Sequence, residues 1–308
     1  MSVHDRLLRN QRYRNLVPPR AKAAFAENRV RLRHVTHRSE VRNIYHCCVH
    51  KTGSQWIRKV FADPATYRVT GLRTYAYGPR LDDDDRSRTY RDISFDRPFP
   101  AGRIVSPLYI PYQGFAALTK PEPWRAFFVM RDPRDVVISW YFSSISSHPT
   151  NSSRGMRRTR EHLANLDEEQ GLIDSIHRLV EYGLFDALGS WAGVIAPGVL
   201  VVRYEDLIGD DRDRWWKRLL DHCDVSLPDA DREALLARYS FQVLSGRPPG
   251  QEDTGSKLRK GVAGDWHNHF TPAVEAAFAE ETADLVHRMG YEDEWPVSRS
   301  SKAGPPAS

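Results

Sequence analysis

The sequence predicts an α/β domain with a largely parallel central sheet flanked by helices. Short apolar runs, such as 126–130 and 198–202, alternate with longer helical patterns. This alternation is typical of parallel strands joined by helical crossovers. A further apolar run, 44–49, leads through a short glycine-containing turn into a helix expected over 54–61. Because open parallel sheets bind ligands beyond the carboxyl ends of their strands, the residues that follow these runs form the candidate site.

The remaining elements follow from capping signals and apolar periodicity. After 126–130, Asp132 can cap a helix, Pro133 suits its first position and Asp135 favours its positive end. Longer helices are expected over 172–192, 212–222, 229–239 and 272–289, the last of them stopped by Gly290.

The chain of 308 residues is long enough for one large core, and we expect a single domain over 41–297. Residues 1–40 carry ten Lys or Arg against three acidic residues, which predicts a basic N-terminal arm. Such an arm can contact nucleic acid or an anionic membrane surface, whereas a solvated leader helix is the simpler interpretation. The Ser- and Pro-rich segment 298–308 is expected to be a disordered tail.

The hydropathy pattern indicates a cytoplasmic protein. No apolar run approaches the roughly 18 residues that a membrane-spanning helix needs, and the first residues have no secretory signal pattern. Weak contact with a membrane surface through the basic arm is the one membrane association that the sequence suggests. The oligomeric state is left open.

The segment His50-Lys51-Thr52-Gly53-Ser54-Gln55-Trp56 carries the strongest chemical signal. It lies where a strand turns into a helix, so exposed backbone N–H groups, the positive end of a helix dipole and a mobile ammonium group lie together. This combination predicts a phosphate or sulfate site. It is not a Walker A loop, because no glycine precedes the lysine.

Two further clusters follow other strands or loops. Arg131 follows the strand 126–130, with Ser139 two helical turns later. Arg259, Lys260 and Gly261 begin a segment that runs on to Gly264-Asp265-Trp266-His267-Asn268. Adjacent cations beside glycines suit a loop that wraps a phosphate, although a basic surface loop remains the alternative for that segment alone.

Together the three clusters resemble the sulfotransferases that use 3′-phosphoadenosine 5′-phosphosulfate (PAPS). In that family a Lys-x-Gly-Thr-Thr-Trp loop holds the phosphosulfate, an Arg with a Ser eight residues later holds the 3′-phosphate, and a late Arg-Lys-Gly-x-x-Gly-Asp-Trp segment closes over it. The resemblance spans about 43–290. It implies a P-loop-like strand-turn-helix and PAPS as co-substrate. We expect no metal, because the helix N-terminus and the lysine already supply positive potential.

The resemblance also implies specific binding residues. Tyr204 lies in a segment similar to the family's Tyr-Glu-Asp motif near the adenine, and Ser240-Phe241 is similar to a Ser-Phe pair. The expected co-substrate contacts are therefore Lys51, Thr52, Gly53, Ser54, Gln55, Trp56, Arg131, Ser139, Tyr204, Ser240, Phe241, Arg259, Lys260 and Gly261. The sequence departs from the family pattern at Gln55, which replaces a second hydroxyl, and at 103–109, which lacks the catalytic histidine of many members.

Sulfuryl transfer needs a cation at the leaving oxygen, donors along the sulfuryl oxygens and a proton acceptor. Lys51 is expected to be the catalytic cation, and Ser54 with backbone N–H groups the donors. His148, after the Arg131 helix, is the candidate proton acceptor. A surface-loop histidine is the alternative interpretation of His148, and His50 is its rival for the role.

Two other functions compete with this one. A nucleotide-dependent phosphotransferase would need Mg²⁺ and carboxylates near Lys51, yet the apolar strands end at Arg131 and Arg203 rather than at Asp. A nucleic-acid-binding protein would interleave many aromatics with its cations, and the arm offers few, such as Tyr13. We therefore expect no nucleic-acid partner. The acceptor stays open among small molecules, carbohydrates, lipids and peptides.

Overall fold

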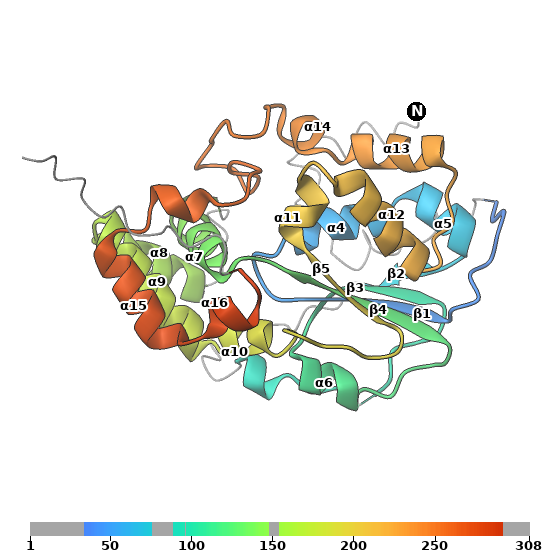
Figure 1. Ribbon diagram of the computed structural model, residues 1–308, viewed down its shortest axis with the longest axis horizontal. Helices are drawn as coiled ribbons and strands as arrows, with labels where there is room; N and C mark the ends of the chain where they lie inside the picture. Colours follow the sequence, from blue (N-terminus) through green and yellow to red (C-terminus); the bar gives the residue numbers. More distant parts are fainter. Residues whose placement is uncertain (1–33, 76–88, 96, 148–153, 292–308) are drawn as a thin grey trace, which may run out of the picture.

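The computed structural model describes residues 34–75, 89–95, 97–147 and 154–291. Within them, five parallel strands form one sheet in the order β2-β3-β1-β4-β5 (Figure 1). The strands are β1 (Asn43–Cys48), β2 (Arg73–Tyr75), β3 (Arg103–Tyr109), β4 (Trp124–Met130) and β5 (Val199–Arg203). The predicted α/β fold class is confirmed.

The register of the strands brings their carboxyl ends to one edge. Cys48 at the end of β1 pairs with Tyr109 at the end of β3, and Met130 at the end of β4 pairs with Arg203 of β5. The loops that leave β1, β3, β4 and β5 therefore start from neighbouring positions. This edge is where a parallel sheet binds its ligand.

One face of the sheet is covered by α4 (Ser54–Phe61), α5 (Pro64–Thr70), α12 (Arg212–His222) and α13 (Asp229–Arg238). Ile44, Phe127 and Val202 point to this side and pack with Ile57 of α4 and Trp216 of α12. All five side chains are almost completely buried. Burial of apolar area on this scale is the main term that holds the helices on the sheet.

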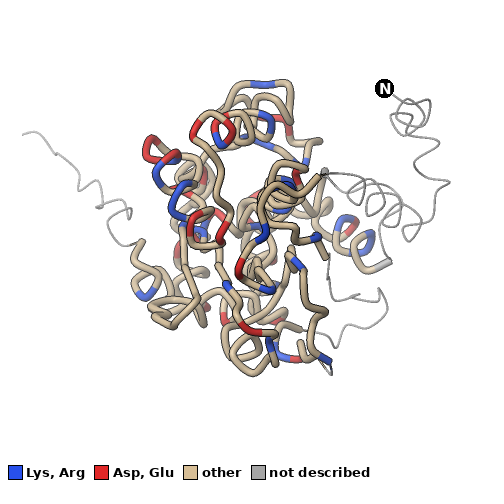
Figure 2. The backbone as a smooth tube through the Cα atoms, turned by 90° about the vertical axis from the view of Figure 1, so that its right-hand side faces the viewer, with Lys and Arg blue, Asp and Glu red and all other residues tan. Residues whose placement is uncertain are grey.

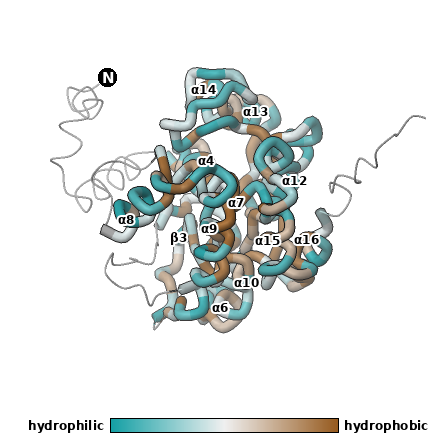
Figure 3. Tube along the Cα trace, turned by 90° about the vertical axis from the view of Figure 1, so that its left-hand side faces the viewer, coloured by the Kyte–Doolittle hydropathy of each residue, from teal (hydrophilic) through white to brown (hydrophobic). Residues whose placement is uncertain are grey.

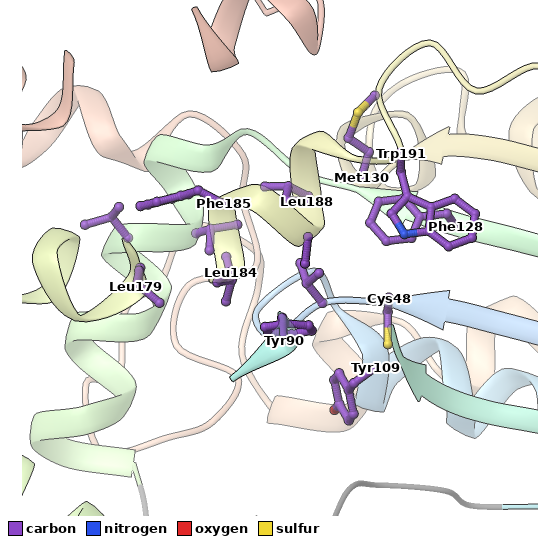
Figure 4. Close-up of a cluster of buried hydrophobic side chains, with 14 of the residues drawn as sticks. Cys48, Tyr90, Tyr109, Phe128, Met130, Leu179, Leu184, Phe185, Leu188 and Trp191 are labelled. Carbon is purple, nitrogen blue, oxygen red and sulfur yellow. The ribbon is translucent and has the colours of Figure 1, made fainter. Parts of the chain in front are cut away.

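The opposite face is covered by α6 (Tyr112–Ala117) and α10 (Leu184–Gly189), while α7 (Pro133–Phe142), α9 (Glu168–Glu181), α15 (Pro272–Thr282) and α16 (Leu285–Arg288) extend this layer beyond the sheet edge (Figure 1). Trp191 stacks on Phe128 with ring centroids 4.6 Å apart (Figure 4). Its indole N–H donates to the carbonyl of Ile110 at 3.0 Å, so the polar group of this buried side chain has a hydrogen-bond acceptor.

The other described helices are short or peripheral. They are α8 (Arg154–Leu163), α11 (Tyr204–Ile208), α14 (Phe241–Ser245), the single turns η1 (Tyr90–Asp92) and η3 (Asp265–Asn268), and the π-turn η2 (Ser143–Ser147). Figure 3 shows α8 as largely hydrophilic, in keeping with its many charged residues. None of the helices in the described ranges is long and apolar enough to cross a membrane.

Several boundaries agree with the sequence prediction. The helix α4 covers the residues expected, as does α12, and α13 ends one residue before the predicted 239. The helix α7 begins at Pro133, and the Asp132 carboxylate accepts the backbone N–H of Arg134 at 2.8 Å, as expected of an N-cap.

Two predicted helices are wrong in their continuity. The span 172–192 is divided between α9 and α10, because Gly183 between them adopts φ 70°. The span 272–289 is divided between α15 and α16, where Ala283 adopts φ 48°. The apolar periodicity continues through both breaks, so it conceals a change of helix direction.

Some expectations fall outside the described residues. They are the greater part of the basic arm 1–40, the tail 298–308 and the candidate base His148. Residues 34–40 are described, and Ser39 at their end donates to Asp224 at 2.6 Å, which fastens this segment to the domain.

Candidate anion-binding site

The turn between β1 and α4 exposes a row of backbone donors. In the part of the chain that the structure describes, the N–H groups of Thr52, Gly53, Ser54 and Gln55 have no hydrogen-bond acceptor. Gly53 is the N-cap of α4 with φ 79°, and it supplies no capping side chain. An anion placed here would accept hydrogen bonds from these N–H groups at the positive end of the helix.

The packing of Tyr204 against the turn also requires glycine at position 53. A Cβ atom at this position would lie 3.0 Å from the ring of Tyr204, which packs over the turn. Both the positive φ and the close approach favour glycine. The loops after β1 and β5 are therefore in direct contact at the sheet edge.

Lys51 lies in this turn and is partly buried. Burial, followed by the nearby charges of Lys257 and Arg131, lowers the pKa of its ammonium group to about 7. No carboxylate in the described ranges pairs with Lys51. Lys51 thus lies among other cations with no described carboxylate paired to it, an arrangement that a bound anion would stabilise.

Arg131 connects the loop after β4 to the turn after β1. Its Nη1 donates to the carbonyl of Lys51 at 3.0 Å, and its Nη2 lies 3.4 Å from Asp135 Oδ2. Its guanidinium lies 4.6 Å from the centroid of the Tyr204 ring. The buried Nε has no hydrogen-bond partner within the described chain. The structure thus brings Lys51 and Arg131 together and leaves one arginine donor for a ligand.

Ser139 lies on α7 and is partly exposed. Its hydroxyl makes no hydrogen bond with any described residue. The indole N–H of the adjacent Trp140 is buried and likewise has no acceptor in the described chain.

Arg259 and Lys260 are held by acids instead of standing free. Both contact the Asp265 carboxylate, and Arg259 also pairs with Glu252. Burial would raise the pKa of Asp265, but hydrogen bonds from His269, Lys260 and Arg259 outweigh it and hold the pKa well below its usual range. A phosphate that binds these cations must therefore share them with Asp265.

Asp135 joins the three sequence clusters, and its role was missed in the sequence. Its Oδ2 accepts the N–H of Gly264 at 2.9 Å, and its Oδ1 accepts the N–H of Trp266 at 3.0 Å. Through its ion pair with Arg131 it extends this network to the carbonyl of Lys51. The only signal in the sequence was an acid in the first turn of a helix, which we interpreted as a response to the helix dipole.

Aromatic rings line the space beside these loops. The indole of Trp56 donates to the Tyr239 carbonyl at 2.7 Å, and its ring lies 6.1 Å from that of Tyr204. Gly261 has φ 69°, and a Cβ there would lie only 2.3 Å from the Phe241 ring. These flat surfaces suit a nucleobase, which can stack on them.

Ser240 caps α14 by accepting the Val243 N–H at 3.3 Å, so its hydroxyl has a structural partner already. The Thr52 hydroxyl donates to the Val49 carbonyl at 3.0 Å and closes the turn from within. The backbone N–H of Thr52, not its side chain, is thus the group that faces a ligand.

Tyr109, which the sequence interpretation did not single out, ends β3 beside Cys48 (Figure 4). Its hydroxyl lies 3.0 Å from Ser54 Oγ and 3.1 Å from Gln55 Nε2. Burial raises the pKa of Tyr109 to about 12. The signal that could have found it is its place as the last residue of a strand, the position from which ligand contacts come.

His50 precedes Lys51 and lies within an aromatic cluster. Its Nδ1 is 2.7 Å from the Tyr90 hydroxyl, and its ring stacks on Tyr109 with centroids 4.2 Å apart. His269 instead lies between two acids, Glu168 at 2.6 Å and Asp265 at 3.5 Å. Among the residues with described positions, no group of three or more His, Cys, Asp or Glu side chains could hold a metal ion.

Charges over the described chain are mixed in sign. Basic and acidic residues are interspersed in the view of Figure 2 and do not form one basic stripe. The concentration of cations at Lys51, Arg131 and Lys257 is therefore a local property of the sheet edge.

Comparison with known proteins identifies the family that the sequence motifs resemble. A family model described as a sulfotransferase domain matches residues 46–290. Mouse sulfotransferase 2B1 is 27% identical over 205 residues, which are 62% of this chain and 56% of that protein. Sulfotransferase 2A1 of Macaca fascicularis is 23% identical over 258 residues, which are 79% of this chain and 80% of that protein. The chain thus spans little more than half the length of the first relative.

A solved structure supports the fold. The crystal structure of mouse sulfotransferase SULT7A1, whose title describes it as complexed with PAP, superposes with a TM-score of 0.51 and 17% identity. The superposition covers 82% of this chain and 87% of that one.

Proposed function

The chain belongs to the sulfotransferase domain family, and from that premise we propose that it transfers the sulfuryl group of PAPS to a hydroxyl or amine acceptor. The observation that carries the proposal is the anion site at the sheet edge. There Lys51, with its pKa lowered to about 7 by burial and neighbouring cations, precedes N–H groups at the start of α4 that have no acceptor among the described residues.

The proposed reaction is an in-line transfer. The bond between sulfur and the bridging phosphate oxygen breaks, a bond from sulfur to the acceptor oxygen or nitrogen forms, and the acceptor loses its proton. Lys51 is proposed to stabilise the negative charge that develops on the bridging oxygen. Ser54 and the N–H groups of the turn are proposed to hold the sulfuryl and 5′-phosphate oxygens.

The remaining contacts are assigned to the nucleotide. Arg131, Ser139 and Arg259 are proposed to hold the 3′-phosphate, because Arg131 Nε and the Ser139 hydroxyl have no partner among the described residues and Arg259 stands on the adjacent loop. The rings of Trp56, Tyr204 and Phe241 are proposed to flank the adenine. Gln55, Ser240, Lys260 and Gly261 complete the binding surface.

Two histidines are proposed for the acceptor proton, His148 and His50. His50 lies next to Lys51 in the chain, and its ring is held between the hydroxyl of Tyr90 and the ring of Tyr109. For the acceptor we propose a small molecule, a carbohydrate or a lipid with a free hydroxyl. A small molecule is the first class to test, because one relative, from Cavia porcellus, is named 3-alpha-hydroxysteroid sulfotransferase.

The test uses 3′,5′-diphosphoadenosine (PAP), the product nucleotide. PAP should raise the melting temperature without added metal, and a concentration of 100 times its Kd should stabilise the fold by about 2.7 kcal/mol. It should bind much more tightly than 5′-AMP, because each charge-assisted bond to the 3′-phosphate contributes about 1.5–3 kcal/mol.

The variant Arg259→Ala should weaken PAP about tenfold to a hundredfold and leave 5′-AMP nearly unchanged. Equal affinities of the wild type for both nucleotides would contradict the 3′-phosphate assignment. Stabilisation seen only with ATP and Mg²⁺ would favour a phosphotransferase instead.

A further inference from the structure

We propose that Tyr109 and Gln55 form a relay of hydrogen bonds that aims the Ser54 hydroxyl at the bound anion. The inference rests on the proposed function, since it assumes that the 5′-phosphosulfate of PAPS lies at the start of α4. It assigns positioning roles to two residues, one of which replaces a hydroxyl of the family pattern.

The sheet register places Tyr109 for this role. Tyr109 ends β3 and pairs with Cys48, the last residue of β1. Ser54, which begins α4, follows Cys48 by six residues. Its ring is held by stacking on His50, with an angle of 4° between the two planes. Its hydroxyl thereby reaches both Ser54 Oγ at 3.0 Å and Gln55 Nε2 at 3.1 Å.

The direction of the relay follows from the amide of Gln55. Arg58 Nη1 donates to Gln55 Oε1 at 3.4 Å, so the carbonyl oxygen of the amide faces Arg58 and its NH₂ group faces Tyr109. Tyr109 accepts that N–H and keeps its own proton, because burial raises the pKa of the phenol to about 12. Tyr109 has a single O–H, and the 3.0 Å distance to Ser54 Oγ allows either hydroxyl to be the donor; in the relay Tyr109 donates to Ser54.

Ser54 then has its own proton to donate. The buried thiol of Cys48 is one partner within its reach, because burial raises the pKa of Cys48 overall while a hydrogen bond with Ser54 acts to lower it. Sulfur is a weak acceptor, whereas an oxygen of a phosphate or sulfate is a strong one. A bound anion would therefore draw the Ser54 hydroxyl away from Cys48, and the donation from Tyr109 would strengthen the new bond.

The relay explains why Gln55 is compatible with the site although it lacks a hydroxyl. Its side chain is exposed and reaches back to Tyr109. In this arrangement Gln55 contributes to anion binding through Ser54 and by its backbone N–H, with no need for a direct side-chain contact.

A double-mutant cycle tests the relay, with PAP affinity measured by calorimetry for Tyr109→Phe, Ser54→Ala and the double variant. Tyr109→Phe alone should weaken PAP about threefold to tenfold. In the Ser54→Ala background the same change should alter the affinity by less than about twofold, because Tyr109 acts through Ser54. Gln55→Met, a change at an exposed side chain, should follow the same pattern.

The control is Tyr90→Phe, which removes another buried phenol that bonds to His50 but not to Ser54. Its effect on PAP affinity should be the same in both backgrounds. Equal losses from Tyr109→Phe with and without Ser54 would overturn the relay while leaving the proposed function intact. A wild-type protein that does not bind PAP would overturn both.

Discussion

Lys51 is the residue whose protonation should report ligand binding. Burial, followed by the charges of Lys257 and Arg131, disfavours the ammonium form and lowers its pKa to about 7. A bound polyanion favours that form and raises the pKa. Binding at pH 8 should therefore take up about one proton, and affinity should fall as the pH rises above 7.

Calorimetry in two buffers of different ionisation enthalpy measures this uptake. Lys51→Arg is the matched control, because it keeps the positive charge but does not titrate in this range. If both proteins take up the same number of protons, another group is responsible, such as Glu205, whose pKa burial raises to about 7.

The proton acceptor is also a question at the scale of single residues. His148→Ala should lower turnover by about a hundredfold or more while PAP affinity stays the same, since a general base acts on the acceptor and not on the nucleotide. His37→Ala, at an exposed position, is the control. A near-normal rate for His148→Ala transfers the role to His50, and the same measurement on His50→Ala then decides it.

The element on which the site depends is the first turn of α4. Gly53 and Gly102 have nearly the same φ, 79° and 78°, but a Cβ at Gly53 would lie 3.0 Å from Tyr204 whereas a Cβ at Gly102 would meet nothing within 4 Å. Alanine at either position should cost about 1–2 kcal/mol for the left-handed backbone.

Only Gly53→Ala should also impair the site, and its PAP affinity should fall by at least about tenfold. The affinity of Gly102→Ala should fall by less than about twofold. Chemical unfolding measures the first effect and calorimetry the second. Similar affinities in the two variants would mean that the Gly53 turn does not shape the nucleotide site.

On the scale of the whole molecule, Asp135 connects the sheet edge to the loop that contains Gly264 and Trp266. Asp135→Asn offers one amide oxygen where the carboxylate has two, so one buried N–H loses its acceptor at a cost of about 1–3 kcal/mol. Denaturant unfolding should show this loss, and hydrogen exchange should become faster at Gly264 or Trp266.

The control for this change is Asp186→Asn. Asp186 forms an ion pair with Arg91 in which both side chains are more than half exposed, and such pairs contribute about 1 kcal/mol or less. An effect of Asp135→Asn no larger than that of Asp186→Asn would show that the loop is held by other contacts.

The sequence by itself determined the local parts of this protein. The strand-turn-helix around Lys51, the capped start of α7 at Asp132 and the full length of α12 were all predicted from short patterns. These features depend on alternating apolar residues, turn glycines and caps, whose physical causes act within one or two turns of the chain.

Tertiary structure decided how these parts meet. Tyr109 bonds to Ser54 across 55 positions, and Asp135 bonds to Gly264 across 129. Neither contact follows from periodicity, because strand register and crossover direction set which loops share the sheet edge. The helix breaks at Gly183 and Ala283 were also decided by packing, because the apolar pattern continues through both positions. The lowered pKa of Lys51 likewise arises only when burial and cations distant in the sequence come together.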